Sequence, residues 1–261
     1  LAVVRSSGET AKNGAVAAAY SRAFRSFGVD VETQDVETSI ADLGCHRQIA
    51  LPLAASLDHW FLVRAALRAD SVVSGKLVAV ARGIDPEPLR DRVRSSWLAP
   101  TNEAERTELL ELAASIDVRA QHPTTLLCLG GALDHAGHAD SGLRLLQQAQ
   151  LAFPGDFWLS YALGLRFYEQ EDYVSAIRFF TAAISIRPSA APAYNNLGSA
   201  LCRTRRMDEA VAVYQEALAL DPSDAMAHAN LGNALSMQGK CGEALIACRK
   251  AVELDPDYAL G

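Results

Sequence analysis

The 261-residue chain carries a formal net charge of −7, and half of its residues are hydrophobic. This acidic balance argues against a nucleic-acid-binding protein, in which a basic stripe is expected. The most apolar stretch, residues 46–69, is interrupted by Asp58, His59 and Arg64, which excludes a membrane span. Five cysteines without C-x-x-C spacing indicate reduced, small and mostly buried residues, so we expect a cytoplasmic protein.

The front part of the chain, residues 1–120, is predicted to be helical but not visibly repeated. Apolar residues at helical spacing predict helices over 8–27, 36–44, 46–69, 72–83, 86–97 and 101–120. The third is one buried helix or two, bent near Pro52, and Asp85 is a candidate N-cap for the fifth. No segment has the alternation of a strand, so the fold class is all-α. This part holds degenerate helical hairpins or a separate helical cap.

Residues 121–258 repeat one pattern with a period of 34: a Leu-Gly pair, then a small residue, then an alanine, then a proline. The glycines are Gly130, Gly164, Gly198 and Gly232, the small residues Gly142, Ala176, Ala210 and Ala244, and the prolines Pro154, Pro188, Pro222 and Pro256. This period with these residues is typical of tetratricopeptide repeats. We expect four repeats, over 123–156, 157–190, 191–224 and 225–258.

Each repeat is predicted to contain two helices, the second of which ends at the proline. The expected helices are 124–137, 140–152, 158–170, 173–186, 192–204, 207–220, 226–238 and 241–254. A glycine inside a helix costs about 1 kcal/mol relative to alanine, so we expect Gly198 to face Ala210 and let two backbones approach closely. Stacked pairs would form a right-handed α-solenoid whose inner wall is lined by the first helix of each repeat.

Both ends of the sequence lead us to expect a piece of a longer protein. Leu1 is not an initiator methionine and no signal peptide follows it. No capping helix follows the fourth repeat, whereas terminal repeats of solenoids normally need a polar cap.

The sequence shows no pattern that supports catalysis. Neither a G-x-G-x-x-G nor a G-x-x-x-x-G-K-[ST] loop occurs, and the protein-kinase signatures are missing. His135 and His138 have no third ligand at metal spacing, so solvated turn histidines explain them better. Cys248 stands where earlier repeats have Tyr214 and Phe180, which favours core packing. We therefore expect no catalytic residue, no metal and no cofactor, and the chain itself is not predicted to be an enzyme.

The remaining chemistry is binding, by residues that flank the Leu-Gly pairs and would face the groove. The candidate peptide-binding residues are Trp158, Tyr161, Leu165, Tyr168, Asn195, Asn196, Ser199, Arg203, Asn230 and Asn233. An asparagine amide both donates to and accepts from a peptide backbone, and Asn196 and Asn230 stand one period apart. The aromatic group would hold an apolar side chain. The alternatives are that the asparagines satisfy neighbouring helices and that Trp158 is interhelical core.

A second resemblance extends over residues 15–258. It rests on residues 57–60, 63–64, 91–94, 116–121, 155–159 and 180–188. These segments resemble the region behind the catalytic domain of planctomycete-type bacterial serine/threonine protein kinases, although His59 stands where an acidic residue is expected. The resemblance implies a helical segment and a tetratricopeptide tail, with the kinase domain upstream and absent here.

Asn196 and Asn230 also resemble the asparagine ladder of the protein O-linked N-acetylglucosamine transferase. The carboxylate-clamp repeats of chaperone adaptors match less well, because only Arg203 has a counterpart. We therefore predict a module that binds a protein or an extended peptide, without nucleic acid and without membrane insertion, as the regulatory or targeting tail of a serine/threonine kinase. The alternatives are substrate delivery in a protein glycosyltransferase, or purely structural repeats.

Overall fold

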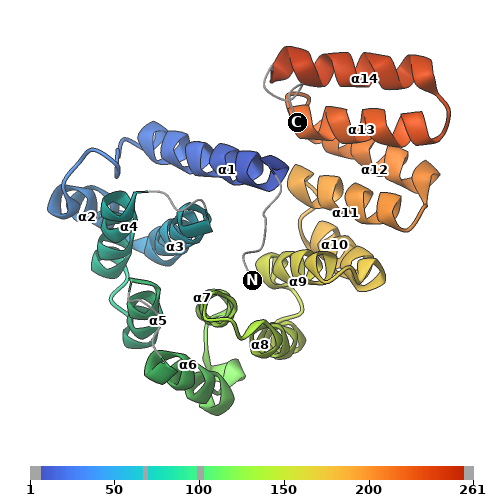
Figure 1. Cartoon of the computed structure of the whole chain (residues 1–261). Helices are drawn as coiled ribbons and strands as arrows, with labels where there is room; N and C mark the ends of the chain where they lie inside the picture. The colour runs from blue at the N-terminus through green and yellow to red at the C-terminus, as the bar shows by residue number, and fades with distance from the viewer. Residues whose placement is uncertain (1–6, 67–69, 99–102, 256–261) are drawn as a thin grey trace. The chain divides into compact units, whose positions relative to one another are not determined.

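The computed structural model describes residues 7–66, 70–98 and 103–255. Every regular element in these ranges is a helix, which confirms the predicted all-α class. The chain divides into two compact units, Leu1–Gly142 and Leu143–Gly261, and the division falls inside helix α8 (Ala139–Ala152) (Figure 1). The predicted boundary after residue 120, between a front segment and four repeats, stays a prediction.

The first unit is built from seven helices and two short 3₁₀ turns within the described residues. The helices are α1 (Ser7–Ser26), α2 (Val36–Gly44), α3 (Ala50–Ala66), α4 (Ser71–Ile84), α5 (Pro88–Leu98), α6 (Glu103–Ser115) and α7 (Pro123–His135). The 3₁₀ turns are Arg47–Ile49 and Val118–Ala120. All six helices predicted for residues 1–120 are therefore present, with two main differences: α3 needs no bend at Pro52, and the last of them is shorter than predicted.

Those two differences have local causes. Pro52 lies in the first turn of α3, where a missing N–H is harmless, so the helix needs no bend there. The predicted helix 101–120 is too long, because α6 ends at Ser115 and Asp117 then caps a 3₁₀ turn through the backbone N–H of Arg119 (3.1 Å). The predicted start of that helix at residues 101–102 lies outside the described residues.

An aromatic stack joins α1 to α3 in the first unit. Trp60 is 1% exposed, and its ring stacks on Phe24 and Tyr20 at centroid distances of 5.7 and 6.1 Å. Helical spacing puts Tyr20 and Phe24 on one face of α1. This packing gives α1 an apolar anchor on α3.

A buried cluster of charges links α3, α4, α5 and α7. Arg94 on α5 donates to both carboxylate oxygens of Asp58 on α3, at 2.9 and 2.8 Å, and also to the backbone oxygen and a carboxylate oxygen of Asp85. Arg90 donates twice to Asp85, each time at 2.6 Å, and once to the hydroxyl of Thr125 on α7 at 2.7 Å. The side chains of Arg94 and Asp58 are 1% and 2% exposed, so water supplies almost none of their hydrogen bonds.

The assignment of Asp85 as an N-cap is therefore wrong. Asp85 closes α4 at its C-terminus, and its carboxylate is taken up by the two arginines of the cluster. The Glu87 carboxylate accepts instead from the backbone N–H groups of Leu89 and Arg90 in the first turn of α5. Burial opposes ionisation of Asp85, but the hydrogen bonds from Arg90 and Arg94 outweigh it and hold the pKa of this carboxyl below its usual value.

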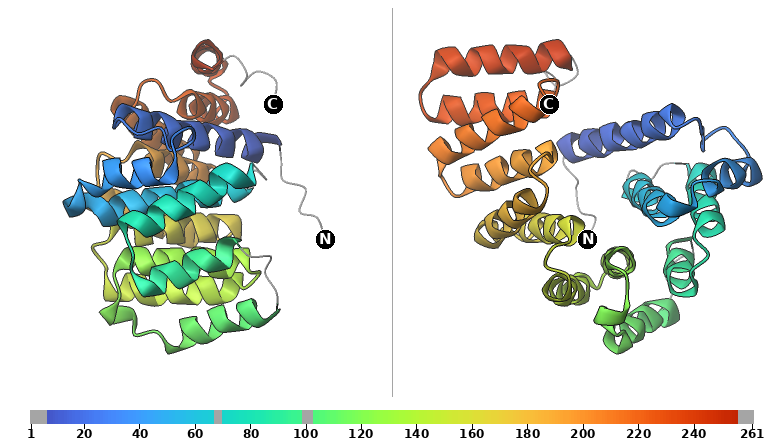
Figure 2. Two further views of the ribbon diagram at one scale, coloured as in Figure 1. Left: turned by 90° about the vertical axis from the view of Figure 1, so that its left-hand side faces the viewer. Right: turned by 180° about the vertical axis from the view of Figure 1, so that it is seen from behind.

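The second unit stacks the helices of the repeats in chain order, with α14 at one end (Figures 1 and 2). After α8 they are α9 (Phe157–Glu169), α10 (Tyr173–Ile186), α11 (Ala191–Arg203), α12 (Met207–Leu220), α13 (Ala225–Met237) and α14 (Cys241–Leu254). All helices predicted from the repeat are confirmed, with bounds shifted by at most two residues, and so is the α-solenoid.

The turn between the two helices of a repeat requires a left-handed residue at one fixed position. Gly137 and Gly239 occupy it with φ of 88° and 79°, whereas Glu171 and Arg205 occupy it with φ of 61° and 63°. These four residues stand 34 apart, so this position belongs to the repeat pattern as well. A side chain in this conformation costs about 1–2 kcal/mol, which glycine avoids.

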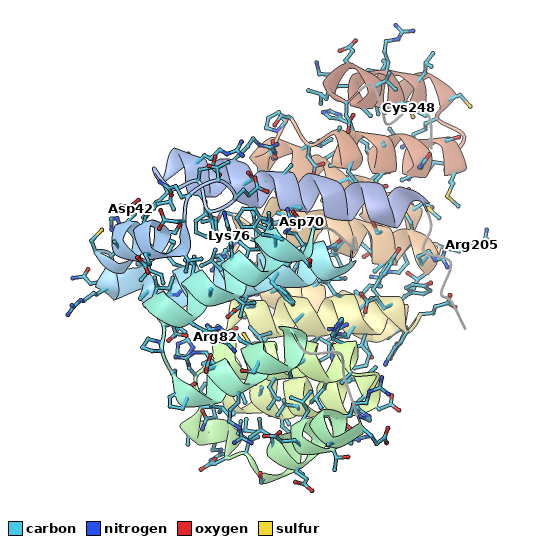
Figure 3. The ribbon with its side chains drawn as sticks, turned by 60° about the vertical axis from the view of Figure 1, so that its left-hand side comes forward. Asp42, Asp70, Lys76, Arg82, Arg205 and Cys248 are labelled. Carbon is cyan, nitrogen blue, oxygen red and sulfur yellow. The ribbon has the colours of Figure 1, made fainter. Side chains whose placement is uncertain are left out.

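Replacing Arg205, labelled in Figure 3, with glycine is therefore expected to stabilise the protein. The gain should be about 0.5–1 kcal/mol, because glycine relieves the strained φ but gives the unfolded chain more freedom. Urea unfolding followed by circular dichroism measures it. The reverse change at the equivalent position, Gly239→Ala, should destabilise by a similar amount, and a loss of stability in Arg205→Gly would contradict the explanation.

The glycines of the Leu-Gly pairs make room for a side chain of the second helix, and at Gly232 for its backbone as well. An ideal Cβ on Gly198 would lie 2.6 Å from the ring of Tyr214, and one on Gly164 would lie 2.6 Å from the ring of Phe180. The expected pairing of Gly198 with Ala210 stays a prediction, and the equivalent pair in the fourth repeat does approach closely, since a Cβ on Gly232 would lie 3.2 Å from the backbone oxygen of Ala244. Tyr214 projects from α12 onto the bare backbone of α11, and its exposure is only 2%.

Candidate peptide-binding surface

The first helices of successive repeats are joined side by side by asparagines. The Nδ2 of Asn196 on α11 donates to the hydroxyl of Tyr161 on α9 at 2.8 Å. The Nδ2 of Asn230 on α13 donates to Oδ1 of Asn195 on α11 at 3.0 Å. One amide hydrogen of each donor is used in this way, while Oδ1 of Asn196 and of Asn230 still has acceptor capacity.

The asparagines therefore do satisfy neighbouring helices, and this fixes how they point. Asn195 is only 4% exposed, whereas Asn196 and Asn230 are half-buried. Ser199, one turn further along α11, donates to the backbone oxygen of Asn195 at 3.0 Å and lies 3.1 Å from the hydroxyl of Tyr214. Asn195, Asn196 and Ser199 on α11 thus each have a hydrogen-bond partner before any ligand is bound.

Trp158 at the start of α9 is 52% exposed, so the assignment to interhelical core is wrong for this residue. Its neighbour Phe157 takes the core position, 7% exposed, against Ala183 and Ala193. Trp158 packs edge-on against Phe157 and Tyr161 at centroid distances of 5.0 and 6.2 Å. An exposed indole held in one orientation offers a flat apolar surface to a ligand.

The other end of α9 carries a second aromatic group. Tyr168 lies edge-on to Tyr173 on α10, with the ring centroids 5.3 Å apart. The guanidinium of Arg203 lies 5.1 Å from the ring centroid of Tyr173 and donates to its hydroxyl at 3.0 Å. Of the other candidates, Leu165 is half-buried between the two aromatic groups along α9, and Asn233 on α13 is exposed.

Two residues of this region were missed by the sequence reasoning, because they lie outside the first helices. Tyr173 opens α10, and Arg187 closes it, with its guanidinium 4.3 Å from the ring centroid of Phe157 and 5.4 Å from that of Trp158. Both stand at ends of a second helix, where the chain turns toward a first helix. Their position next to aromatic residues in the repeat register is the signal that would have found them.

Tyr161, whose hydroxyl accepts the hydrogen bond from Asn196, remains neutral. Burial raises the pKa of Tyr161, and the hydrogen bond from Asn196 opposes this only in part.

In the part of the chain that the structure describes, no three histidine, cysteine or acidic side chains gather at metal-binding distance. The expectation that the cysteines are mostly buried is wrong for Cys241, which is exposed. Nor does any described helix combine the length and apolarity needed to cross a bilayer. The contacts that the surface does show are hydrogen bonds and aromatic packing.

Fold and surface together define a helical-repeat protein-interaction module. Four family models match the repeated part, one described as TPR repeat over residues 206–239 and three as Tetratricopeptide repeat over 129–191, 191–220 and 226–258. Residues 129–258 are therefore tetratricopeptide repeats, as the 34-residue period predicted.

Known proteins match part of this chain. The peroxisomal targeting signal receptors of Candida albicans and Debaryomyces hansenii are 44% and 45% identical over 52 and 49 residues, which are 20% and 19% of this chain. The match spans less than a tenth of either receptor, 9% and 8% of its length. Among solved structures, MamA (AMB-1) is 25% identical with a TM-score of 0.54, covering 65% of this chain and 99% of MamA. Another MamA structure, 20% identical with a TM-score of 0.56, shares the fold.

Proposed function

We propose that the second unit captures extended protein segments on the surface formed by α9, α11 and α13. The observation that carries this proposal is the anchoring of Asn196 and Asn230, each by a hydrogen bond to the preceding first helix. Among the residues that the structure describes, none donates to the amide oxygen of either asparagine, and the two oxygens recur with the repeat, as the backbone N–H groups of an extended peptide recur. Because the amides are already fixed, little conformational entropy is lost on the protein side when a peptide binds.

The aromatic residues of α9 supply the apolar part of the proposed site. Trp158 is the large exposed ring, and Tyr161 connects it to the asparagines of α11. A partner with an apolar side chain beside a free stretch of backbone fits both parts of this surface. The peroxisomal targeting signal receptors that match part of this chain are named as receptors of a targeting signal, which is in keeping with such a role.

The double variant Asn196→Ala/Asn230→Ala is expected to bind a captured peptide about tenfold more weakly or worse. A phage-displayed library of unstructured dodecapeptides supplies the probe, and calorimetry with the selected synthetic peptide measures the affinity. Tyr161→Phe is the comparison variant, because it removes the hydrogen bond that fixes the Asn196 amide, worth about 0.5–1.5 kcal/mol, but keeps the amide, so it should weaken binding less than the double variant. Equal loss of affinity in Tyr161→Phe and the double variant would mean that the asparagines act only through the fold.

We further propose that this module is the regulatory or targeting tail of a serine/threonine protein kinase. What supports this is where the sequence resemblance falls: Asp58 and Arg94 belong to the resembling segments, and they pair in the buried cluster of the first unit. The resembling segments thus include a buried ion pair, which requires a particular packing of helices. Such residues are not chance matches on the surface. The resemblance of Asn196 and Asn230 to the ladder of a glycosyltransferase supports substrate delivery as the second candidate.

The coding sequence on either side of these 261 residues distinguishes the two candidates. A kinase domain upstream, with its glycine-rich loop and catalytic aspartate, is the expected result. A glycosyltransferase domain in the same reading frame would instead assign the repeats to substrate delivery. If neither domain is encoded there, both candidate functions would be contradicted, and a scaffold of repeats would be the remaining function.

A further inference from the structure

A hollow in the first unit, between α1, α3 and the loop that follows α1, is lined by three arginines. Its volume is about 400 Å³. The charged residues that line it are Arg22 and Arg25 on α1, Arg64 near the end of α3, and Glu32 in the loop. Ser21 and two alanines of α1 complete the wall. Three cationic side chains therefore surround one acidic side chain.

The loop after α1 holds Glu32 in a fixed place. Val31 beside it is 1% exposed, and the backbone N–H of Glu32 donates to a carboxylate oxygen of Asp30 at 3.2 Å. Nζ of Lys76 on α4, labelled in Figure 3, donates to the backbone oxygens of Glu32 and Gln34 at 3.2 and 3.0 Å. The carboxylate of Glu32 is therefore positioned by the fold between α1 and α3.

Glu32 in turn fixes two of the guanidiniums at the wall of the hollow. Its Oε2 accepts from the hydroxyl of Ser21 at 2.7 Å and from Arg25 at 3.0 Å, and its Oε1 accepts from Arg64 at 3.2 Å. A second N–H of Arg25 goes to Asp30 at 3.0 Å. Because a guanidinium has five N–H donors, both arginines keep donors for a further acceptor, whereas the carboxylate of Glu32 is nearly saturated.

Arg22 adds a positive charge that no described group balances. It is exposed, and no described side chain forms a hydrogen bond or an ion pair with it. The lining therefore has three positive charges and one negative charge, an excess of two, in a chain whose net charge is −7. Lys76 and Asp30 adjoin the hollow with opposite charges and leave this excess unchanged. A phosphate monoester, with a charge of about −1.5 to −2 at pH 7, matches it.

We propose that the hollow binds a phosphate monoester group. Arginine suits this ligand, because its planar fork donates to two phosphate oxygens at once. The side chain of Arg64 is 12% exposed and that of Arg25 is 51% exposed, so an enclosed and an open guanidinium both reach the ligand. Since Glu32 already fixes both, little side-chain entropy is lost on binding. The site lies in the first unit, so it goes beyond the proposed capture of peptides by the second.

Isothermal titration calorimetry of the 261-residue chain at low ionic strength tests the proposal, with inorganic phosphate and O-phospho-L-serine as the probes. The expected result is one-to-one binding with a dissociation constant of about 1 mM or tighter, which weakens as salt is added. Acetate at the same ionic strength should bind about tenfold more weakly or worse, because it carries a single charge. No binding of either phosphate probe, or acetate that binds as well as phosphate, overturns the proposal.

Arg22→Gln is expected to weaken the binding of both probes by about fivefold or more, because it removes one of the two excess charges. The fold tolerates this change, since Arg22 contacts no described side chain. Arg47→Gln is the matched control: Arg47 is exposed in the same unit and precedes α3, whereas Arg64 lies about 20 Å further along that helix. Unchanged binding in Arg22→Gln, or equal weakening in Arg47→Gln, overturns the site.

The two probes also distinguish the source of the phosphate. Tighter binding of O-phospho-L-serine than of inorganic phosphate would support a site for a phosphorylated molecule, whose attached group also contacts the hollow. Equal affinities that both fall in Arg22→Gln would support a site that recognises the phosphate alone. Affinities that ignore Arg22→Gln in both probes would place the binding elsewhere on the chain and overturn the proposal.

Discussion

Replacing Arg94 with methionine is expected to lower the free energy of unfolding by about 3–5 kcal/mol, because removing one partner strands a buried charge. Arg94 is 1% exposed and makes two hydrogen bonds to Asp58 and two to Asp85. Without it, the carboxylate of Asp58 loses its only positive neighbour among the described groups that hydrogen-bond to it. Urea unfolding followed by circular dichroism measures the loss, and amide hydrogen exchange should localise it to the first unit.

Two further variants separate a stranded charge from lost packing. Arg92→Ala on the same helix removes an arginine whose ion pair with Glu108 is exposed, and it should change stability by about 1 kcal/mol or less. The double variant Asp58→Leu/Arg94→Met should recover most of the loss, because a matched apolar pair no longer needs solvation. If the double variant were as unstable as the sum of its parts, the large effect of Arg94 would have to come from packing alone.

This cluster also shows what the sequence could not predict. Its members lie far apart, with 36 residues between Asp58 and Arg94 along the chain, so no local spacing reveals that they meet. The one available signal was the place of Asp58 inside an apolar helix, because a charge there needs a buried partner. Asp85, in contrast, stands before a proline and a helix, and its local sequence is equally compatible with an N-cap. Only the packing of α5 against α3 and α4 decides between the two roles.

The repeats were predictable because their sequence pattern is local and recurs four times. The helix bounds follow from the period, since each proline and each Leu-Gly pair recurs in register. The contacts within a repeat were harder to predict from the sequence. Gly198 and Ala210 are both small, but small size does not reveal which neighbour fills the space. For the candidate surface, the register predicted which residues lie on the first helices. It did not predict that Tyr161 would anchor Asn196, because hydroxyl and amide lie 35 residues apart.

Replacing Gly164 with leucine is expected to destabilise the protein by about 1–3 kcal/mol through overpacking. The added Cβ would lie 2.6 Å from the ring of Phe180, which is fully buried. Either the ring leaves its rotamer or α9 and α10 separate, and both weaken the packing that holds the repeat together. Thermal unfolding by calorimetry measures the effect.

Gly242→Ala is the matched control for this change, because a Cβ on Gly242 of α14 meets nothing within 4 Å. The control should leave stability unchanged or raise it by up to about 1 kcal/mol, since alanine favours the helix. A second comparison locates the cause: Gly164→Leu combined with Phe180→Ala should be less destabilised than the two single changes added together, because the smaller residue makes room for the leucine. Strict additivity would mean that Gly164 and the ring of Phe180 do not compete for the same space, and the glycine of the repeat would then need another explanation.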